Sequence, residues 1–170
     1  QLVEIGYDID PETEIALGEA AELAGKTQDA ETHYNRGLSS FKEIEDKRGE
    51  IDALHHLGSL FDFVIYDEVK ARKYYEDSLA IAREIEAGWE LSFSLRGIAK
   101  FMERDGEYEL AERYLREALD IKVADGVHSA KYEIINLARL AKTQGKLDEY
   151  IDLSKQALNL AVEEFNQDII

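Results

Sequence analysis

The feature that most constrains this chain is an internal repeat of about forty residues. A small residue followed by leucine recurs at separations of 41, 40 and 39 residues, at Gly37-Leu38, Ser78-Leu79, Ala118-Leu119 and Ala157-Leu158. A second marker recurs at the same separations, at Ala30, Ala71, Ala111 and Tyr150. Because both markers recur at the same separations, they indicate a tandem array of one structural unit. This property decides the fold class.

Each repeat also holds an upstream segment marked by a large residue and then a small one, at Leu17-Gly18, Leu57-Gly58, Ile98-Ala99 and Leu137-Ala138. Both segments have helical periodicity. Turn glycines separate them in three repeats, at Gly25, Gly106 and Gly145, whereas the second repeat has Ile65-Tyr66-Asp67 and one extra residue. We expect helices at about 11–25, 28–47, 50–64, 68–87, 89–105, 108–124, 128–144 and 147–166. These form four repeats, 11–47, 50–87, 89–124 and 128–166, in one domain over residues 1–170.

Local signals predict where these helices begin and end. Asp10-Pro11 is typical of a helix start, because Asp caps free backbone N–H groups and Pro lacks one. Thr27 and Asp67 are expected to cap the helices that follow them. Glycines at the repeat junctions, Gly49, Gly88 and Gly126, are expected where one helix ends and the chain reverses.

The helix-pair layout resembles the tetratricopeptide repeat. In that repeat a large-small pair is followed by a small residue, an aromatic residue and another small residue. Two sets fit this order, Leu17-Gly18/Ala30/Tyr34/Gly37 and Leu57-Gly58/Ala71/Tyr75/Ser78. The third set, Ile98-Ala99/Ala111/Leu115/Ala118, has leucine at the aromatic position. The fourth set, Leu137-Ala138/Tyr150/Ser154/Ala157, departs most. The long period is similar to the variant in signal-transducing ATPases, related transcription regulators and kinesin light chains. The resemblance implies an all-α, right-handed α-solenoid whose first helices line a concave groove.

Charge and composition exclude several classes of partner. The net charge is −17, from 20 Lys and Arg against 37 Asp and Glu. Such a chain repels phosphate backbones and anionic lipid, so we expect no nucleic acid or membrane partner. No apolar run reaches the roughly 18–20 residues of a membrane span. The absence of cysteine fits a reducing compartment, and we expect a cytoplasmic protein.

The chain begins with Gln1 rather than Met, and its first ten residues, QLVEIGYDID, imitate the end of a second helix. Ile169-Ile170 follow the last helix where a terminal repeat normally has a polar face. We therefore expect a piece of a longer array or multidomain protein.

No constellation for catalysis is visible, and we expect neither enzymatic activity nor a cofactor. Asp52 and His56, four residues apart, share a helix face, but no third metal ligand follows from the spacing. Tyr34, Phe41 and Tyr75 fall at core spacing rather than in a ligand cage. Trp89 is expected to pack between adjacent repeats.

Candidate binding residues lie one turn before or after the large-small pairs. In the last two repeats they are Phe93, Arg96, Lys100, Arg104, Tyr132, Asn136, Arg139 and Lys142. In the first two they are mainly acidic: Glu12, Glu19, Glu22, Asp52, His55, Ser59 and Asp62. Arg96 and Asn136 resemble part of the clamp with which some tetratricopeptide domains hold a peptide carboxylate. The alternative is that these cations pair internally with Glu90, Glu103 or Glu133.

We therefore expect a scaffold that binds a protein or peptide in the concave groove, with an acidic segment or C-terminal carboxylate of the partner on the basic half. A second interpretation is a ligand-sensing regulatory segment of a larger signal-transducing ATPase or transcription regulator.

Overall fold

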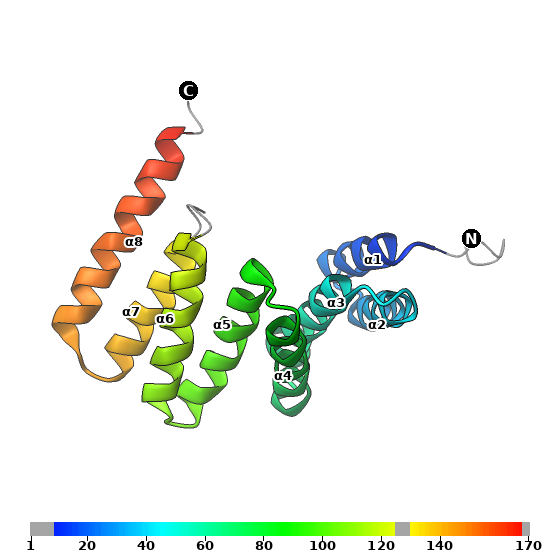
Figure 1. Ribbon diagram of the computed structural model, residues 1–170, viewed down its shortest axis with the longest axis horizontal. Coiled ribbons are helices and arrows are strands. Elements are labelled where there is room, and N and C mark those ends of the chain that lie inside the picture. Colours follow the sequence, from blue (N-terminus) through cyan, green and yellow to red (C-terminus); the bar gives the residue numbers. More distant parts are fainter. Residues whose placement is uncertain (1–8, 125–129, 168–170) are drawn as a thin grey trace. The chain divides into compact units, whose positions relative to one another are not determined.

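The computed structural model describes residues 9–124 and 130–167, and these form α-helices and one π-helical segment, with no strand among them. The elements are α1 (Pro11–Leu23), α2 (Thr27–Glu43), α3 (Lys47–Ser59), the π-helix η2 (Leu60–Ile65), α4 (Glu68–Glu84), α5 (Gly88–Arg104), α6 (Tyr108–Ala124), α7 (Lys131–Thr143) and α8 (Leu147–Gln167) (Figure 1). The predicted all-α solenoid of helix-turn-helix repeats is confirmed. No helix in the described ranges is long and apolar enough to cross a bilayer.

The helices divide into two compact units, Gln1–Glu90 and Leu91–Ile170. Unit 1 contains α1 to α4, and unit 2 contains α6 to α8 with most of α5. Within each unit, consecutive helices lie side by side and run in opposite directions (Figure 1). That all four repeats form one continuous domain stays a prediction.

Small residues let paired helices of unit 1 approach closely. A Cβ atom built on Gly18 would overlap the Tyr34 ring, and one on Gly58 would lie 3.0 Å from the Tyr75 ring. The two tyrosines are buried, and so is Phe41, so the predicted core role of these aromatic residues is confirmed. The large-small pairs therefore mark where an aromatic ring of the second helix rests on the first helix.

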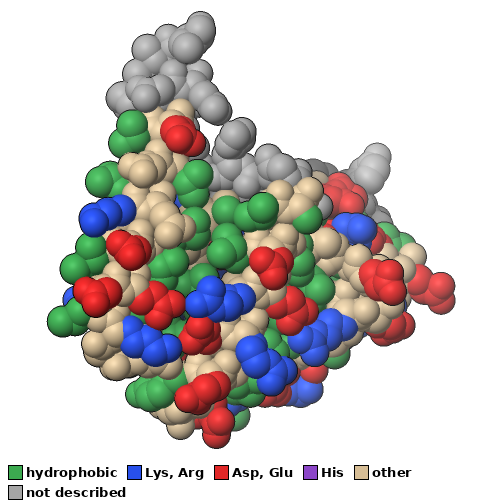
Figure 2. Space-filling model, turned by 60° about the vertical axis from the view of Figure 1, so that its left-hand side comes forward, with side chains coloured by type: hydrophobic (Ala, Val, Ile, Leu, Met, Phe, Trp, Pro, Cys, Tyr) green, Lys and Arg blue, Asp and Glu red, His purple; other side chains and the backbone are tan. Residues whose placement is uncertain are grey.

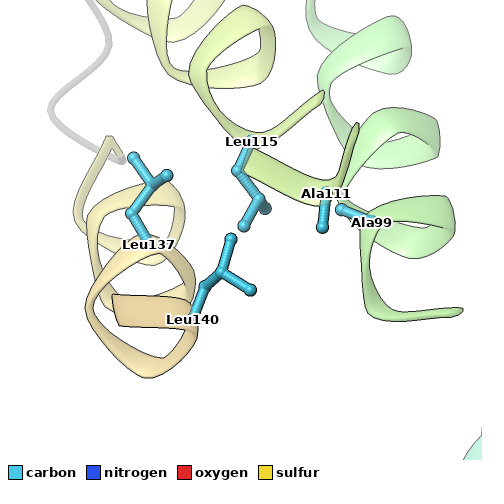
Figure 3. Close-up of a cluster of buried hydrophobic side chains, with 5 residues drawn as sticks. All are labelled: Ala99, Ala111, Leu115, Leu137 and Leu140. Atoms are coloured by element: carbon cyan, nitrogen blue, oxygen red, sulfur yellow. The ribbon is translucent and has the colours of Figure 1, made fainter. Parts of the chain in front are cut away.

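The core of unit 2 joins three successive helices. Leu115 of α6 packs between Ala99 and Ala111 on one side and Leu137 and Leu140 of α7 on the other (Figure 3). All five side chains are at most 3% exposed. The predicted burial of Ala111, and of its counterpart Ala71 in unit 1, is confirmed.

Most helices end with the same backbone hydrogen bond, in which an N–H donates to the carbonyl five residues earlier and the residue just before that N–H has a positive φ. At Gly25, Gly106 and Gly145, φ is 70°, 82° and 73°, as predicted for turn glycines. At the repeat junctions the same left-handed position is held by glutamates, Glu45 (φ 58°) and Glu86 (φ 50°). The following N–H closes each turn, as in the 2.9 Å bonds from Asp46 to the Phe41 carbonyl and from Ala87 to the Ala82 carbonyl.

The junction glycines therefore have other positions than predicted. Gly49 lies inside α3, where a Cβ would overlap the buried Phe41 ring, so its role is close packing. Gly88 is the first residue of α5. Gly126 and the predicted start of the seventh helix at 128 lie outside the described residues, as do residues 1–8 and 168–170.

Two of the three predicted caps are confirmed. Asp10 accepts a 2.9 Å bond from the Thr13 N–H, and Asp67 accepts a 3.1 Å bond from the Lys70 N–H. Thr27 is instead the first residue of α2, because the N-cap position is occupied by Lys26, whose side chain makes no capping bond. Asp46, which was not predicted as a cap, bonds the N–H groups of Arg48 and Gly49.

The extra residue of the second repeat is absorbed by the π-helix. Gly58 and Ala71 are 13 residues apart, whereas Gly18 and Ala30, and Ala99 and Ala111, are 12 apart. The segment Leu60–Ile65 widens the helix by one residue per turn, and Tyr66 then turns the chain at φ 62° without a glycine. The two markers thus keep their packing contacts despite the insertion.

Two substitutions with opposite expected effects on stability test these turn conformations. Gly106→Ala should lower the free energy of unfolding by about 1 kcal/mol, because an L-residue is disfavoured at positive φ. No atom within 4 Å would contact the added Cβ, so the cost is conformational alone. Glu45→Gly should raise stability by a similar amount for the same reason. Urea unfolding of both variants checks this, and changes of the same sign would contradict it.

Candidate functional site: the first-helix face of unit 2

All eight predicted partner-binding residues belong to unit 2. Phe93, Arg96, Lys100 and Arg104 follow one another on α5, and Tyr132, Asn136, Arg139 and Lys142 on α7. None is buried: Arg104, Tyr132, Arg139 and Lys142 are exposed and the other four are partly exposed. Helical spacing of three and four residues places each set on one face of its helix, as the sequence predicted.

Arg96 is held between two aromatic rings. Its guanidinium carbon lies 4.8 Å from the centre of the Phe93 ring and 6.0 Å from that of Tyr132. Nη1 of Arg96 also donates a 3.5 Å hydrogen bond to Oε1 of Glu133, an α7 side chain that is fully buried. Two rings and one carboxylate therefore fix the plane of a guanidinium that keeps 24% of its side chain exposed.

The hydrogen bond from Arg96 engages only one of the two carboxylate oxygens of Glu133. Its second oxygen, Oε2, is buried and accepts no hydrogen bond from the residues that the structure describes. A buried carboxylate normally recruits several donors. Replacing Arg96 would therefore leave the buried charge without its ion-pair partner among these residues.

Two lysines that sequence reasoning missed complete the cluster around these rings. Nζ of Lys122, from α6, lies 4.5 Å from the centre of the Phe93 ring, and its side chain is nearly buried. Nζ of Lys131 lies 5.2 Å from the centre of the Tyr132 ring. We call Phe93, Arg96, Lys122, Lys131 and Tyr132 the cation–aromatic cluster. No signal identified Lys122, because only first helices were expected to line the groove.

Among the other predicted cations, Arg139 is matched by an acid. Arg139 pairs with Glu103 of α5 and donates a 3.3 Å bond to Oδ1 of Asn136, and Glu103 also accepts a 3.0 Å bond from Thr143. Asn136 in turn donates to the Tyr132 carbonyl at 2.7 Å. The internal pairing expected as an alternative is thus present for Arg139 and Arg96, whereas Glu90 pairs with Arg48.

Lys142 and Arg104 are placed against rings. Nζ of Lys142 lies 5.7 Å from the centre of the Tyr150 ring, and the Arg104 guanidinium lies 5.9 Å from that of Phe101. Figure 2 shows Lys and Arg side chains interspersed with Asp and Glu rather than gathered in one area. Glu103 lies beside the predicted stripes and pairs with Arg139, so the face is mixed in charge, and three of its cations contact aromatic rings of the cation–aromatic cluster.

The acidic face predicted for unit 1 centres on His56. Its Nε2 lies 3.7 Å from Oε1 of Glu19 and 3.8 Å from Oδ1 of Asp52, and its ring stacks on Tyr34 at 5.0 Å. The Tyr34 hydroxyl donates a 3.0 Å bond to Glu22. No group of three or more His, Cys, Asp or Glu in the described ranges is arranged to hold a metal ion.

Burial raises the pKa of the Asp52 carboxyl above its usual 3.8, and this outweighs the opposite effect of His56. A carboxyl whose folded pKa is raised binds its proton more tightly in the folded state, so it lowers stability as pH rises above 3.8. Asp52→Asn should therefore stabilise unit 1 at pH 7, by less than about 1 kcal/mol because the group is half exposed. The gain should vanish below pH 3.8 in urea unfolding, and an undiminished gain there would contradict the shift.

Comparison with known proteins supports the fold. No family model and no curated protein matches the chain. Among solved structures, apo RapI matches with a TM-score of 0.81 at 16% identity, covering 94% of this chain and 58% of RapI. A Rap protein complexed with Competence and Sporulation Factor matches with a TM-score of 0.77 at 18% identity, covering 90% and 43%. A Podosopora anserina putative kinesin light chain with TPR-like repeats gives 0.69 at 15% identity, covering 89% and 75%.

The chain thus spans about half the length of the Rap structures it resembles. Identities this low establish a shared fold only. The matches confirm the tetratricopeptide-like architecture that the forty-residue register predicted.

Proposed function

We propose that this chain is a non-catalytic scaffold for protein interaction and that its unit 2 binds an acidic segment or C-terminal carboxylate of a partner. The observation that carries the proposal is the cation–aromatic cluster. Three cationic side chains contact two rings there, and one of them, Arg96, is preoriented by Glu133. A ligand carboxylate would meet a charge already ordered by the fold, so little entropy is lost on binding.

Arg96 has the chemistry for this role. A guanidinium has five N–H donors in a planar fork that matches a carboxylate, and the described residues occupy one of them. Phe93 and Tyr132 supply apolar area beside the charge. This matters because exposed ion pairs alone are screened at physiological salt.

The similar proteins support the class of function. One Rap structure is a complex with Competence and Sporulation Factor, so this architecture accommodates a bound partner. Another similar structure is named aspartyl phosphate phosphatase F from Bacillus subtilis, with a TM-score of 0.77 at 13% identity. For the present chain we propose no catalysis, since the sequence has no visible catalytic constellation. We also propose no nucleic acid partner and a cytoplasmic setting, on the grounds of charge and composition given above.

Paired peptides test the proposal. A library of acidic peptides with free C-terminal carboxylates should bind the chain more tightly than the same peptides as amides or with Asn and Gln in place of the acids. Binding by fluorescence anisotropy should lose this preference in Arg96→Gln, which keeps side-chain length and removes the charge. Equal affinities for both peptide forms would contradict the proposal.

A further inference from the structure

Helix α4 of unit 1 has one side against the core and the opposite side exposed. Its inner side carries Ala71, Tyr75 and Ala82, which are buried. Its outer side carries a row of exposed side chains that we call the α4 row: Val69, Lys73, Glu76, Ala80 and Arg83. Their spacing of 4, 3, 4 and 3 residues keeps them on one face along the helix. A hollow of about 460 Å³ lies beside the first half of the row, so this surface has room for side chains of a second helix.

The chemistry of the α4 row is complementary to that of a second, antiparallel copy of the row. A two-fold axis midway between Lys73 and Glu76 places Lys73 of one copy opposite Glu76 of the other. The same axis places Val69 opposite Ala80, and both are apolar. Within the chain, Lys73 pairs with Asp77 at 2.5 Å, whereas Glu76 has no hydrogen bond or ion pair among the described residues. Glu76 is therefore an exposed acid whose matching cation would come from the second copy.

We propose that the α4 row is the interface of a homodimer, in which α4 packs antiparallel against α4 of a second copy of this chain. Lys70 and Asp77 flank the row on one side, and this packing brings Lys70 near Asp77 of the second copy. Nζ of Lys70 lies 4.7 Å from the centre of the Phe61 ring and has no ion pair among the described residues. The inference goes beyond the proposed function, because it concerns a surface of unit 1 and a second copy of the chain as the partner.

Charge favours the antiparallel orientation, and it favours α4 over the next second helix. A parallel pair would place Lys73 beside Lys73 and Glu76 beside Glu76, so like charges would oppose it. In α6, 40 residues further along the chain, both of these positions are arginines, Arg113 and Arg116. Two antiparallel copies of α6 would therefore repel each other where two copies of α4 attract.

The dimer should be weak and reversible. A single helix pair buries less than the roughly 800 Å² per partner of a standard protein interface. The net charge of −17 on each copy opposes association, but screening beyond about 8 Å at physiological salt leaves the contacting charges to decide. We therefore expect a dimer that forms at high concentration and dissociates on dilution. Sedimentation equilibrium of the intact chain at physiological salt, at concentrations up to about 1 mM, should show it.

Two charge reversals test the pairing. Lys73→Glu places acids opposite each other and Glu76→Lys places lysines opposite each other, so each variant should self-associate about ten-fold or more weakly than the wild-type chain. An equimolar mixture of the two variants should dimerise again, because every lysine then faces a glutamate. Arg113→Glu, at the equivalent position of α6, changes the net charge as much as Lys73→Glu does and should leave self-association unchanged.

The remaining measurements separate the interface from folding and from the other proposed site. Both reversals lie at exposed positions, so circular dichroism should show wild-type helicity for each. Arg96→Gln should leave self-association unchanged, which separates it from the carboxylate-binding function. A chain that stays monomeric up to about 1 mM, a dimer that neither reversal weakens, or a mixture of the two variants that stays monomeric would each overturn the proposal.

Discussion

Replacing Leu115 with alanine is expected to lower the free energy of unfolding of unit 2 by about 2–5 kcal/mol. Leu115 is 2% exposed and contacts the helices on both of its sides, so the substitution removes buried apolar area and leaves a cavity. The cavity cannot collapse easily, because Ala99 and Ala111 already bring α5 and α6 close together.

Hydrogen exchange of α5–α7 amides measures this effect in unit 2 alone. Leu158→Ala is the matched control, since the same atoms are removed from a side chain that is 63% exposed, and it should change stability by less than about 0.5 kcal/mol. Similar losses in both variants would show that the register of the helix pairs has been misassigned.

The second large effect concerns binding. Arg96→Glu together with Arg139→Glu should weaken binding of an acidic partner peptide by about ten-fold or more, equivalent to about 1.4 kcal/mol or above. Each substitution replaces a cation on the α5–α7 face by an anion, and Arg96 is the residue preoriented by the aromatic rings. The affinity of the wild-type chain should also fall as salt rises.

Two controls show whether a loss of affinity comes from the binding site rather than from unfolding or from the change in net charge. Arg113→Glu with Lys155→Glu changes the net charge equally at exposed positions outside the face, and should leave affinity nearly unchanged. Circular dichroism should show that the first double variant keeps its helicity, although the carboxylate that replaces the Arg96 guanidinium would lie beside Glu133 and cost some stability. Unchanged affinity in the Arg96 and Arg139 variant would mean that these arginines only balance Glu133 and Glu103.

Much of the fold followed from the sequence because packing in a repeat array is local and periodic. The markers at Ala71 and Ala111 predicted the helix contacts, and Tyr34 and Tyr75 the core. The junctions could not be predicted in the same way. Glu45 and Glu86 adopt positive φ against the preference of their side chains, so no residue type signalled the turn.

Sequence periodicity predicts which residues share a helix face, and the site could be predicted to that extent. Periodicity placed Phe93 and Arg96 on one stripe and Tyr132 on another. It could not identify Lys122, whose long side chain reaches the Phe93 ring from a second helix.

The most direct test of the proposed function is an NMR titration that follows the arginine side-chain N–H signals of the chain as an acidic peptide with a free carboxylate is added. The account predicts that the Arg96 Nε–H signal shifts first and farthest, together with the ring signals of Phe93 and Tyr132. It also predicts that these shifts disappear when the peptide is amidated and its acids are neutralised. Shifts confined to unit 1 or to α8, with Arg96 unmoved at saturation, would contradict it.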